Sequence, residues 1–230
     1  ISAIDALILT HLHQDHFGGF FNLIDAVTVR EAIVPYGDIV FNEKVYQYLG
    51  RQEYFMEYHE LFKYFSRAGT RCSNIMRYAG RCLDFGESSL RCLYPLAETR
   101  MEIKDCIPHL CFSRLTNDDM LRYCALYREK CNAESSIWAL TSKRSDIALL
   151  AGDSTVDTMD DALRRYPFHP RILKLSHHGI NSCYFNERQL AAISPQEVVV
   201  CNAREYYTSI ADECERACSP VKARIYYTFD

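Results

Sequence analysis

The sequence has no long apolar segment and no large excess of charge. No hydrophobic run approaches the ~20 residues of a membrane-spanning helix, so we expect no membrane segment in this chain. The net charge of the 230 residues is −4. Because lysine and arginine are also scattered, the chain lacks the basic surface that is typical of tight duplex binders. With 48% hydrophobic residues, it can bury one large core.

The sequence also lacks any C-x-x-C spacing, although it contains eleven cysteines. An odd number of cysteines at irregular spacings fits neither a disulfide framework nor a cysteine-ligated zinc site. A thiol among apolar residues instead behaves as a small hydrophobic side chain. We therefore expect reduced, mostly buried cysteines and a cytoplasmic location.

The most informative segment is residues 10–19, THLHQDHFGG. Four side chains of ligand type fall within six positions: His11, His13, Asp15 and His16. Imidazole nitrogen and carboxylate oxygen are ligands of zinc and its divalent neighbours. His11 and His13, two apart, favour one ion, and the adjacent Asp15 and His16 favour a second. The alternative is a polar loop whose histidines bond to the backbone, but the density of ligands argues against it.

The flanks of this segment support a metal site. Residues 4–9 are mostly apolar and predict a strand that is buried on both faces. Gly18 and Gly19 allow a tight turn, and residues 20–24 predict the start of a packed helix. The ligands would then lie at the carboxyl end of a core strand, where α/β folds place their chemistry.

A strand followed by ligand-type residues recurs twice downstream. The predicted strand 145–150 precedes a glycine and Asp153, and the predicted strand 171–175 precedes His177 and His178. A single Gly-Asp pair after a strand is usually only a turn. The metal interpretation therefore depends on finding ligand-type residues after three predicted strands. Three histidines without ligand-type neighbours are expected at the surface or in the core: His59, His109 and His169.

Together the three motifs resemble the signature of the metallo-β-lactamase superfamily: H-x-H-x-D-H, a bridging aspartate after a strand, and a further histidine. The chain is most similar to the ComEC-type branch, typified by the hydrolase domain of competence DNA-uptake proteins. The likeness runs from about residue 4 to residue 227. The finer likeness is carried by residues 64–95, 132–140 (NAESSIWAL), 149–153 (LLAGD) and 173–179 (LKLSHHG).

The resemblance implies an α/β fold, an αββα sandwich of two mixed β-sheets with helices on the outer faces. It also implies one domain over residues 1–230, with a helical insertion at about residues 43–130. Family members have further strands before the first motif. We therefore expect the chain to be part of a longer polypeptide, with a fusion or partner domain that supplies the missing N-terminal strands.

The resemblance further implies two divalent metal ions, with zinc first and manganese as the alternative. His11 and His13 would hold the first ion, and Asn132 stands where most superfamily members supply a third histidine. An amide oxygen binds zinc more weakly than imidazole does, so this site would be loose or would prefer manganese. Residues 202–209, NAREYYTS, also lack the histidine of the branch's Y-G-H-P segment.

For the second ion, the implied ligands are Asp15, His16 and one of His177 and His178, with Asp153 as the bridge. The remaining histidine of the pair would contact a substrate phosphate or donate a proton, and the sequence does not say which histidine does which. Asp15 is also implied to orient the attacking hydroxide.

Two helices are expected between the motifs. Residues 43–68 show a helical period of apolar residues whose aromatics are either core or, as the alternative, a stacking surface for bases. Residues 117–130 predict a second helix, with Asn117 as its cap. Such helices would roof an active site.

Three functions follow from these residues. Two neighbouring cations lower the pKa of a shared water, which suits phosphodiester cleavage, so the first is a metal-dependent hydrolase, a DNA nuclease by resemblance. The second is hydrolysis of a small ester, thioester, amide or phosphoester on the same site. The third is a binding or regulatory domain with a decayed metal site, favoured by Asn132 and the missing late histidine.

Overall fold

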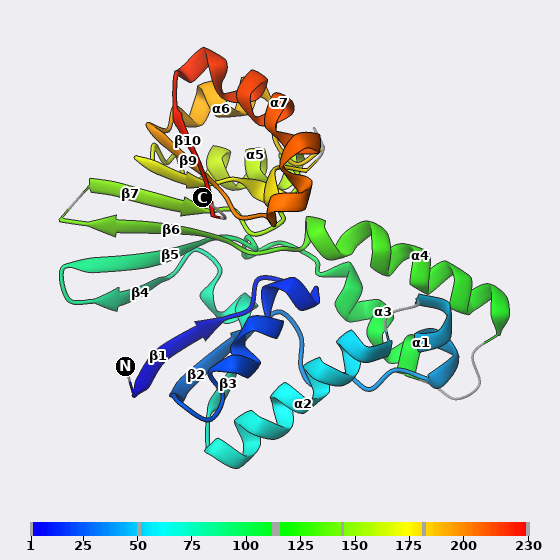
Figure 1. Cartoon of the computed structure of the whole chain (residues 1–230). Helices are drawn as coiled ribbons and strands as arrows, with labels where there is room; N and C mark the ends of the chain where they lie inside the picture. Colours follow the sequence, from blue (N-terminus) through cyan, green and yellow to red (C-terminus); the bar gives the residue numbers. More distant parts are fainter. Residues whose placement is uncertain (1, 50–51, 112–115, 144, 181–182, 229–230) are drawn as a thin grey trace. The chain divides into compact units, whose positions relative to one another are not determined.

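The structure is a computed structural model that describes residues 2–49, 52–111, 116–143, 145–180 and 183–228 (Figure 1). It contains two β-sheets, of three and of seven strands, together with helices. The α/β class and the two sheets expected from the sequence are confirmed, and they are consistent with the fold that the resemblance implies.

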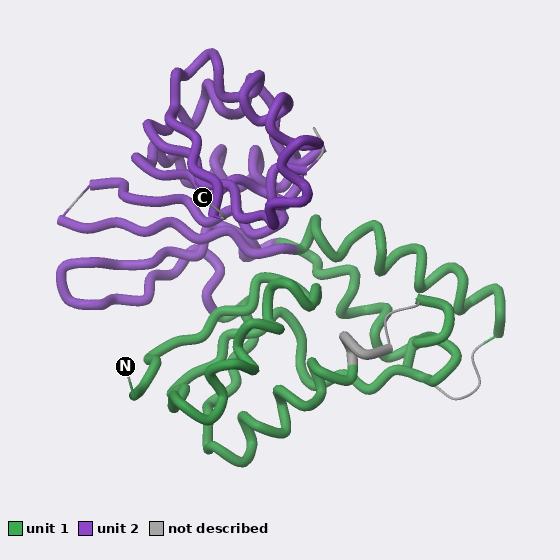
Figure 2. The backbone as a smooth tube through the Cα atoms, viewed as in Figure 1, with its two compact units in different colours: residues 1–77, 99–134 green, residues 78–98, 135–230 purple. Residues whose placement is uncertain are grey.

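The chain divides into two compact units, each built from two segments (Figure 2). Unit 1 contains residues 1–77 and 99–134, and unit 2 contains residues 78–98 and 135–230. The three-stranded sheet belongs to unit 1 and the seven-stranded sheet to unit 2. The expected single domain therefore stays a prediction.

The sheet of unit 1 consists of β1 (Ala3–Ile8), β2 (Thr28–Val34) and β3 (Arg71–Asn74), in that order. Its strands are all parallel, whereas two mixed sheets were expected. The strand predicted over residues 4–9 is confirmed, but its burial on both faces was wrong, because all six side chains of β1 are exposed or half-buried. The reason is that β1 is an edge strand with β2 as its neighbour in the sheet.

Four α-helices complete unit 1: α1 (Glu43–Leu49), α2 (Gln52–Ala68), α3 (Glu102–Cys111) and α4 (Asn117–Ala133). Residues 50–51 lie outside the described residues, so the helix predicted over 43–68 is described as α1 and α2. The predicted cap Asn117 was wrong. The hydroxyl of Thr116 instead accepts a hydrogen bond from the amide of Asp119 at 3.2 Å.

The core of unit 1 is built on α2, which packs against β2. Tyr58, Leu61 and Phe65 follow a helical spacing on α2 and are fully buried, so these positions of the predicted aromatic stripe are core. Tyr48 of α1 and Met56 of α2 are exposed instead. The buried positions therefore belong to the core, and the alternative of a stacking surface for bases stays a prediction.

A buried polar network also holds unit 1 together. The Glu134 carboxylate, which follows α4, accepts hydrogen bonds from the Tyr36 hydroxyl and from the Ile103 amide at 2.9 Å. Burial raises the pKa of both Tyr36 and Glu134. The Ile103 amide lies in the first turn of α3, where amides need a partner outside the helix, so Glu134 joins the end of α4 to the start of α3.

The sheet of unit 2 has the order β10-β9-β8-β7-β6-β5-β4. Pairs from β4 to β7 are antiparallel and pairs from β7 to β10 are parallel, so this sheet is mixed, as expected. Its strands are β4 (Cys82–Phe85), β5 (Ser88–Tyr94), β6 (Ile137–Ser142), β7 (Ser145–Leu150), β8 (Ile172–Lys174), β9 (Glu197–Val200) and β10 (Arg224–Tyr227).

Three α-helices accompany this sheet: α5 (Val156–Arg165), α6 (Glu187–Ile193) and α7 (Tyr207–Cys218). α5 packs against β5, and α6 packs against α7 (Figure 1). The region 43–130, expected as a helical insertion, also contains the strands β3, β4 and β5, because its middle pairs with β2 in one sheet and with β6 in the other.

Short 3-10 helices lie between the strands and α-helices of the described residues. The packed helix expected from residue 20 was wrong, because residues 18–22 form the 3-10 helix η2 (Gly18–Asn22). The others are η1 (Gln14–His16), η3 (Ile75–Tyr78), η4 (Ser176–Gly179), η5 (Arg204–Tyr206) and η6 (Ser219–Val221). η1 and η4 carry predicted metal ligands.

Six of the eleven cysteines are buried, in agreement with the expected burial. Burial raises the pKa of Cys92, Cys106 and Cys214 to about 12. Such thiols stay protonated at neutral pH and serve as packing residues. Among the described residues, no helix combines the length and the apolar character that crossing a bilayer would require.

Candidate functional site

The first group of predicted ligands lies in unit 1, directly after β1. The amide of Leu9 still pairs with the Ile33 carbonyl at 2.9 Å, which fixes where the loop begins. The side chains of Leu9, Leu12 and Phe17 are buried in the core of unit 1. These apolar anchors hold the loop between them, so its polar residues gather on the remaining side.

The imidazoles of this loop lie close together. The ring centroid of His11 is 4.7 Å from that of His13 and 4.2 Å from that of His16. The carboxylate of Asp15 approaches His16 Nε2 at 3.6 Å. His11 is buried, whereas the Asp15 side chain is 58% exposed. The structure therefore brings all four predicted residues of the motif into one group.

Thr10, which had no predicted role, orients two of these histidines. Its Oγ1 lies 3.1 Å from His11 Nδ1 and 3.3 Å from His16 Nδ1. A hydroxyl has one proton and two acceptor sites, so it can serve both rings. When both Nδ1 atoms carry a proton, both donate to this hydroxyl, and the Nε2 lone pairs can then serve as metal ligands. The sequence signal for this role of Thr10 was its position directly before the H-x-H-x-D-H motif.

Asn132 is also part of unit 1 and is buried. Residues 132–140 were likened to a strand, but Asn132 lies in the last turn of α4, and the strand β6 begins only at Ile137. α4 continues because Glu134 anchors its end through the network with Tyr36. The role of Asn132 as a ligand stays a prediction.

The second group of predicted ligands lies in unit 2, where β7 and β8 end. The parallel register pairs Leu150 with Lys174, so the turns that follow the two strands start level with each other. Asp153 follows β7, and its side chain is 1% exposed. Its amide donates to Ser135 Oγ at 2.9 Å, which fixes the turn. Ser135 is the serine of the N-x-x-S segment, so a signal for it was present.

His177 and His178 both adopt left-handed backbone conformations, with φ of 46° and 57°. Such a pair is strained for residues other than glycine and is often found at functional sites. Their Nε2 atoms lie 4.0 Å and 3.5 Å from Asp153 Oδ2, respectively. The strained turn thus aims both rings at the carboxylate.

Main-chain carbonyls orient these two rings. His177 Nδ1 donates to the Ile180 carbonyl at 3.1 Å, and His178 Nδ1 donates to the Cys201 carbonyl at 2.7 Å. A carbonyl oxygen only accepts, so each Nδ1 carries a proton and each Nε2 is the ring nitrogen turned toward Asp153. This arrangement is typical of metal-bound histidine. The donor sets of both groups therefore fit divalent ions.

Residues 202–209, which lack the late histidine of the branch, begin with a residue that contacts the histidine turn. The side-chain Nδ2 of Asn202, after β9, donates to the His178 carbonyl at 3.0 Å. This hydrogen bond therefore holds the backbone of the strained histidine turn. The exposed Tyr206 and Tyr207 follow in η5 and α7.

The remaining histidines have ordinary structural contacts. His59 Nδ1 lies 2.8 Å from the carboxylate of Asp38, so a ligand-type neighbour exists that the sequence spacing could not show. The ring of His109 stacks on that of Tyr123 with centroids 4.4 Å apart. The amide of His169 donates to the Asp146 side chain.

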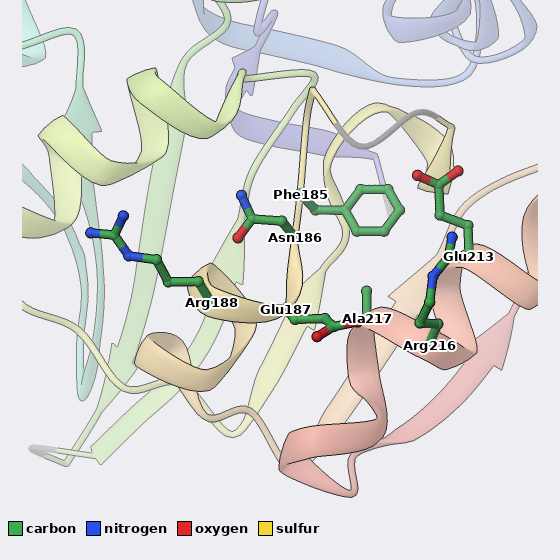
Figure 3. A pocket seen from close by; sticks show the side chains of 7 residues that line it. All are labelled: Phe185, Asn186, Glu187, Arg188, Glu213, Arg216 and Ala217. Atoms are coloured by element: carbon green, nitrogen blue, oxygen red, sulfur yellow. The ribbon is translucent and has the colours of Figure 1, made fainter.

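Unit 2 also contains a cavity of about 490 Å³ between the start of α6 and α7 (Figure 3). Phe185 and Ala217 give it apolar walls, while Glu213 and Arg216 of α7 bring charges of opposite sign. None of the predicted site residues lines it. The ligand-type groups after β1, β7 and β8 therefore remain the candidates for chemistry.

Comparisons with known proteins agree with the metal motif in part. A search of curated proteins found no match. A solved structure, described as Igni18, a novel metallo hydrolase from the hyperthermophilic archaeon Ignicoccus hospitalis, is similar with a TM-score of 0.46 and 11% identity. That alignment covers 97% of this chain and 76% of the other. A family model described as the metallo-beta-lactamase superfamily matches residues 1–67, so the chain is similar to that superfamily over the segment that carries the first ligand group.

Proposed function

We propose that the chain is a metal-dependent hydrolase of phosphodiester bonds, with DNA as the substrate. The observation that carries the metal assignment is the engagement of four imidazole Nδ1 atoms, two by the Thr10 hydroxyl and two by main-chain carbonyls. Contacts of this kind orient histidine rings so that Nε2 can act as a metal ligand. The family match over residues 1–67 adds support. The phosphodiester substrate rests on the likeness to the ComEC-type branch.

The proposed first ion is held by His11 and His13, with Asn132 as a weaker oxygen ligand and Asp153 as the bridge. Imidazole-rich ligands favour zinc, and the amide oxygen leaves manganese as the second choice. Two divalent cations would lower the pKa of a shared water and offset the charge that develops on the phosphate.

The proposed second ion is held by Asp15, His16 and His178, with Asp153 shared. His178 is chosen over His177 because its Nε2 lies closer to Asp153 Oδ2, at 3.5 Å against 4.0 Å. Its backbone is also held by Asn202.

Two groups would act on the substrate rather than hold an ion alone. Asp15, whose carboxylate is more than half exposed, orients the attacking water by accepting its hydrogen bond. His177 rests on the ring of Tyr184, with centroids 3.9 Å apart. We assign it the contact to the phosphate, with a proton on Nε2 that the same ring passes to the leaving oxygen, because a fixed imidazole suits general acid work near neutral pH.

The second candidate function keeps this site but takes a small ester, thioester, amide or phosphoester. The net charge of −4 favours it, because tight binding of a nucleic acid usually relies on a basic surface. The third candidate, a decayed site in a binding or regulatory domain, is supported by Asn132 and by the lack of a histidine in residues 202–209.

Elemental analysis coupled to cleavage assays separates the three. The chain is purified without chelator and assayed on single-stranded and duplex DNA with zinc and manganese added in turn, and on chromogenic esters and phosphodiesters. About two ions per chain with DNA cleavage is the expected result. Ester cleavage alone would favour the second candidate, and less than about one ion per chain would favour the third.

We also propose that a fusion or partner domain adds strands beside β1 and that the protein works in the cytoplasm. The edge position and partial exposure of β1 support the first point, because exposed edge strands usually find a partner. Hydrogen exchange of the β1 amides, slow in a longer polypeptide and fast in this chain, would test it. Cell fractionation would test the location.

A further inference from the structure

Lys174 is a charged residue within the parallel strands of unit 2. It ends β8, between Leu150 of β7 and Val199 of β9 in the register of the sheet. Its side chain is 17% exposed. A lysine so placed is unusual, because the stem of a long cation normally lets its head reach water.

The ammonium of Lys174 lies against the turn that carries Asp153. Nζ donates a hydrogen bond to the Gly152 carbonyl at 2.8 Å and lies 3.6 Å from Asp153 Oδ1. The Gly152 carbonyl also accepts from the His177 amide at 3.3 Å. Lys174 therefore contacts the same carbonyl that joins the aspartate turn to the histidine turn.

The two oxygens of the Asp153 carboxylate face different groups. Oδ1 faces the Lys174 ammonium, whereas Oδ2 faces the Nε2 atoms of His177 and His178. A carboxylate that is 1% exposed is costly to bury without a cation beside it. The lysine supplies that cation on one side and leaves the other side to the imidazoles.

We infer that Lys174 is a resident cation that neutralises and orients Asp153 before a metal ion binds, and that its charge lowers the affinity of the site for that ion. The inference rests on the proposed function, because it takes Asp153 as a metal ligand. Lys174 is thus a positioning residue: it acts through Asp153 and touches no substrate.

For one substitution, the inference predicts a lower stability of the metal-free protein together with a higher affinity for a divalent ion. In Lys174→Met the buried carboxylate loses its counter-charge, so the metal-free protein is destabilised. A divalent ion is then the cation that neutralises the Asp153 carboxylate, and the ammonium no longer repels it. The ion therefore binds more tightly. A purely structural lysine would give the loss of stability without the gain in affinity.

The test uses the full chain and five forms: wild type, Lys174→Met, Lys174→Arg, Asp153→Asn, and Asp153→Asn combined with Lys174→Met. Thermal unfolding is followed in chelator and with zinc, and the zinc Kd is measured by chelator competition. In chelator, Lys174→Met should lower Tm by about 5–10 °C. Its zinc affinity should rise on the order of tenfold, while Lys174→Arg should stay near wild type in both measurements.

The double variant is the matched control. Because the side-chain amide introduced by Asp153→Asn carries no charge, the loss of stability caused by Lys174→Met should largely disappear in that background. If Lys174→Met proves too unstable to purify, a foldable double variant still supports the inference, and a double variant that is equally unstable overturns it.

Other results would also overturn the inference. A Lys174→Met protein with wild-type Tm in chelator, or with weaker zinc binding than wild type, contradicts it. Failure of the proposed function looks different: the wild type would bind no zinc, while the stability measurements in chelator would still show whether Lys174 compensates Asp153.

Discussion

The two groups of ligand-type residues are built in different ways. The group in unit 1 comes from one continuous stretch after β1, and its rings are oriented by a side chain, the hydroxyl of Thr10. The group in unit 2 combines turns after β7 and β8, and its rings are oriented by the carbonyls of Ile180 and Cys201. A local motif can be supported by a neighbour in sequence, whereas a group assembled from two strands depends on the sheet that aligns them.

The groups also differ in how they carry charge. Asp15 in unit 1 is more than half exposed, so water can solvate it. Asp153 in unit 2 is buried and faces Lys174 and two imidazoles. Burial of a carboxylate requires compensation, so the assembled group depends more strongly on its own neighbours than the local group does.

The largest expected effect is that of Asp153→Ala. Activity should fall on the order of a thousandfold or more, with most of the metal lost, because one carboxylate is proposed to serve both ions. The chain should still fold, since Lys174 keeps its bond to the Gly152 carbonyl, but its Tm should fall because the largely buried ammonium loses the Asp153 carboxylate. Turnover, metal content and circular dichroism measure this. Unchanged turnover would reject the bridging role.

The matched change in the local group is Asp15→Ala. It should also impair activity but leave the stability of the metal-free protein unchanged within about 0.5 kcal/mol, because Asp15 is exposed. Equal destabilisation by the two alanine variants would remove the contrast between a local and an assembled group.

Removal of the Thr10 hydroxyl should have the next largest effect. Thr10→Val keeps the shape of the side chain but loses the contacts to His11 and His16, so metal affinity should fall about 10–100-fold. Thr10→Ser keeps the hydroxyl and should stay near wild type. Chelator competition measures both. Equal affinities for the valine and serine variants would mean that the hydroxyl does not orient the rings.

Glycine substitutions after the motifs test the backbone of each group. Gly179 has φ of +78°, and an added Cβ would lie 2.8 Å from Cys214 Sγ and 3.0 Å from Val200 Cγ1. Gly179→Ala should therefore destabilise the protein by about 2 kcal/mol. Gly19→Ala meets no atom within 4 Å and should change stability by less than about 0.5 kcal/mol. Urea unfolding measures both, and similar costs would contradict the expected difference.

The smallest expected effect is that of His59→Ala. His59 pairs with Asp38 on unit 1, and partly exposed ion pairs of this kind contribute about 0–1 kcal/mol. Hydrolytic activity and metal content should remain at wild-type values in the same cleavage assays and elemental analysis. A loss of activity in this variant would show that the site had been assigned to the wrong histidines.

Much of the fold could be predicted from local patterns. The strands before Asp153 and before His177 were found because apolar runs of strand length ended in glycine or polar residues. The cap of α4 was missed by one residue, because Thr116 and Asn117 are both good caps and only the bond to the Asp119 amide distinguishes them. The burial of β1 was missed because an apolar run does not reveal whether its strand lies at an edge.

By itself, the sequence determined which residues have ligand chemistry and that the first group would be local, since six consecutive positions need no tertiary contact to lie near one another. Only the tertiary structure decided which nitrogen each imidazole presents and which cation faces Asp153. Those choices depend on Ser135, Lys174 and the carbonyls of Ile180 and Cys201, which reach the second group through strand pairing between segments distant along the chain. Such pairing is set by the register of the whole sheet, which no local pattern encodes.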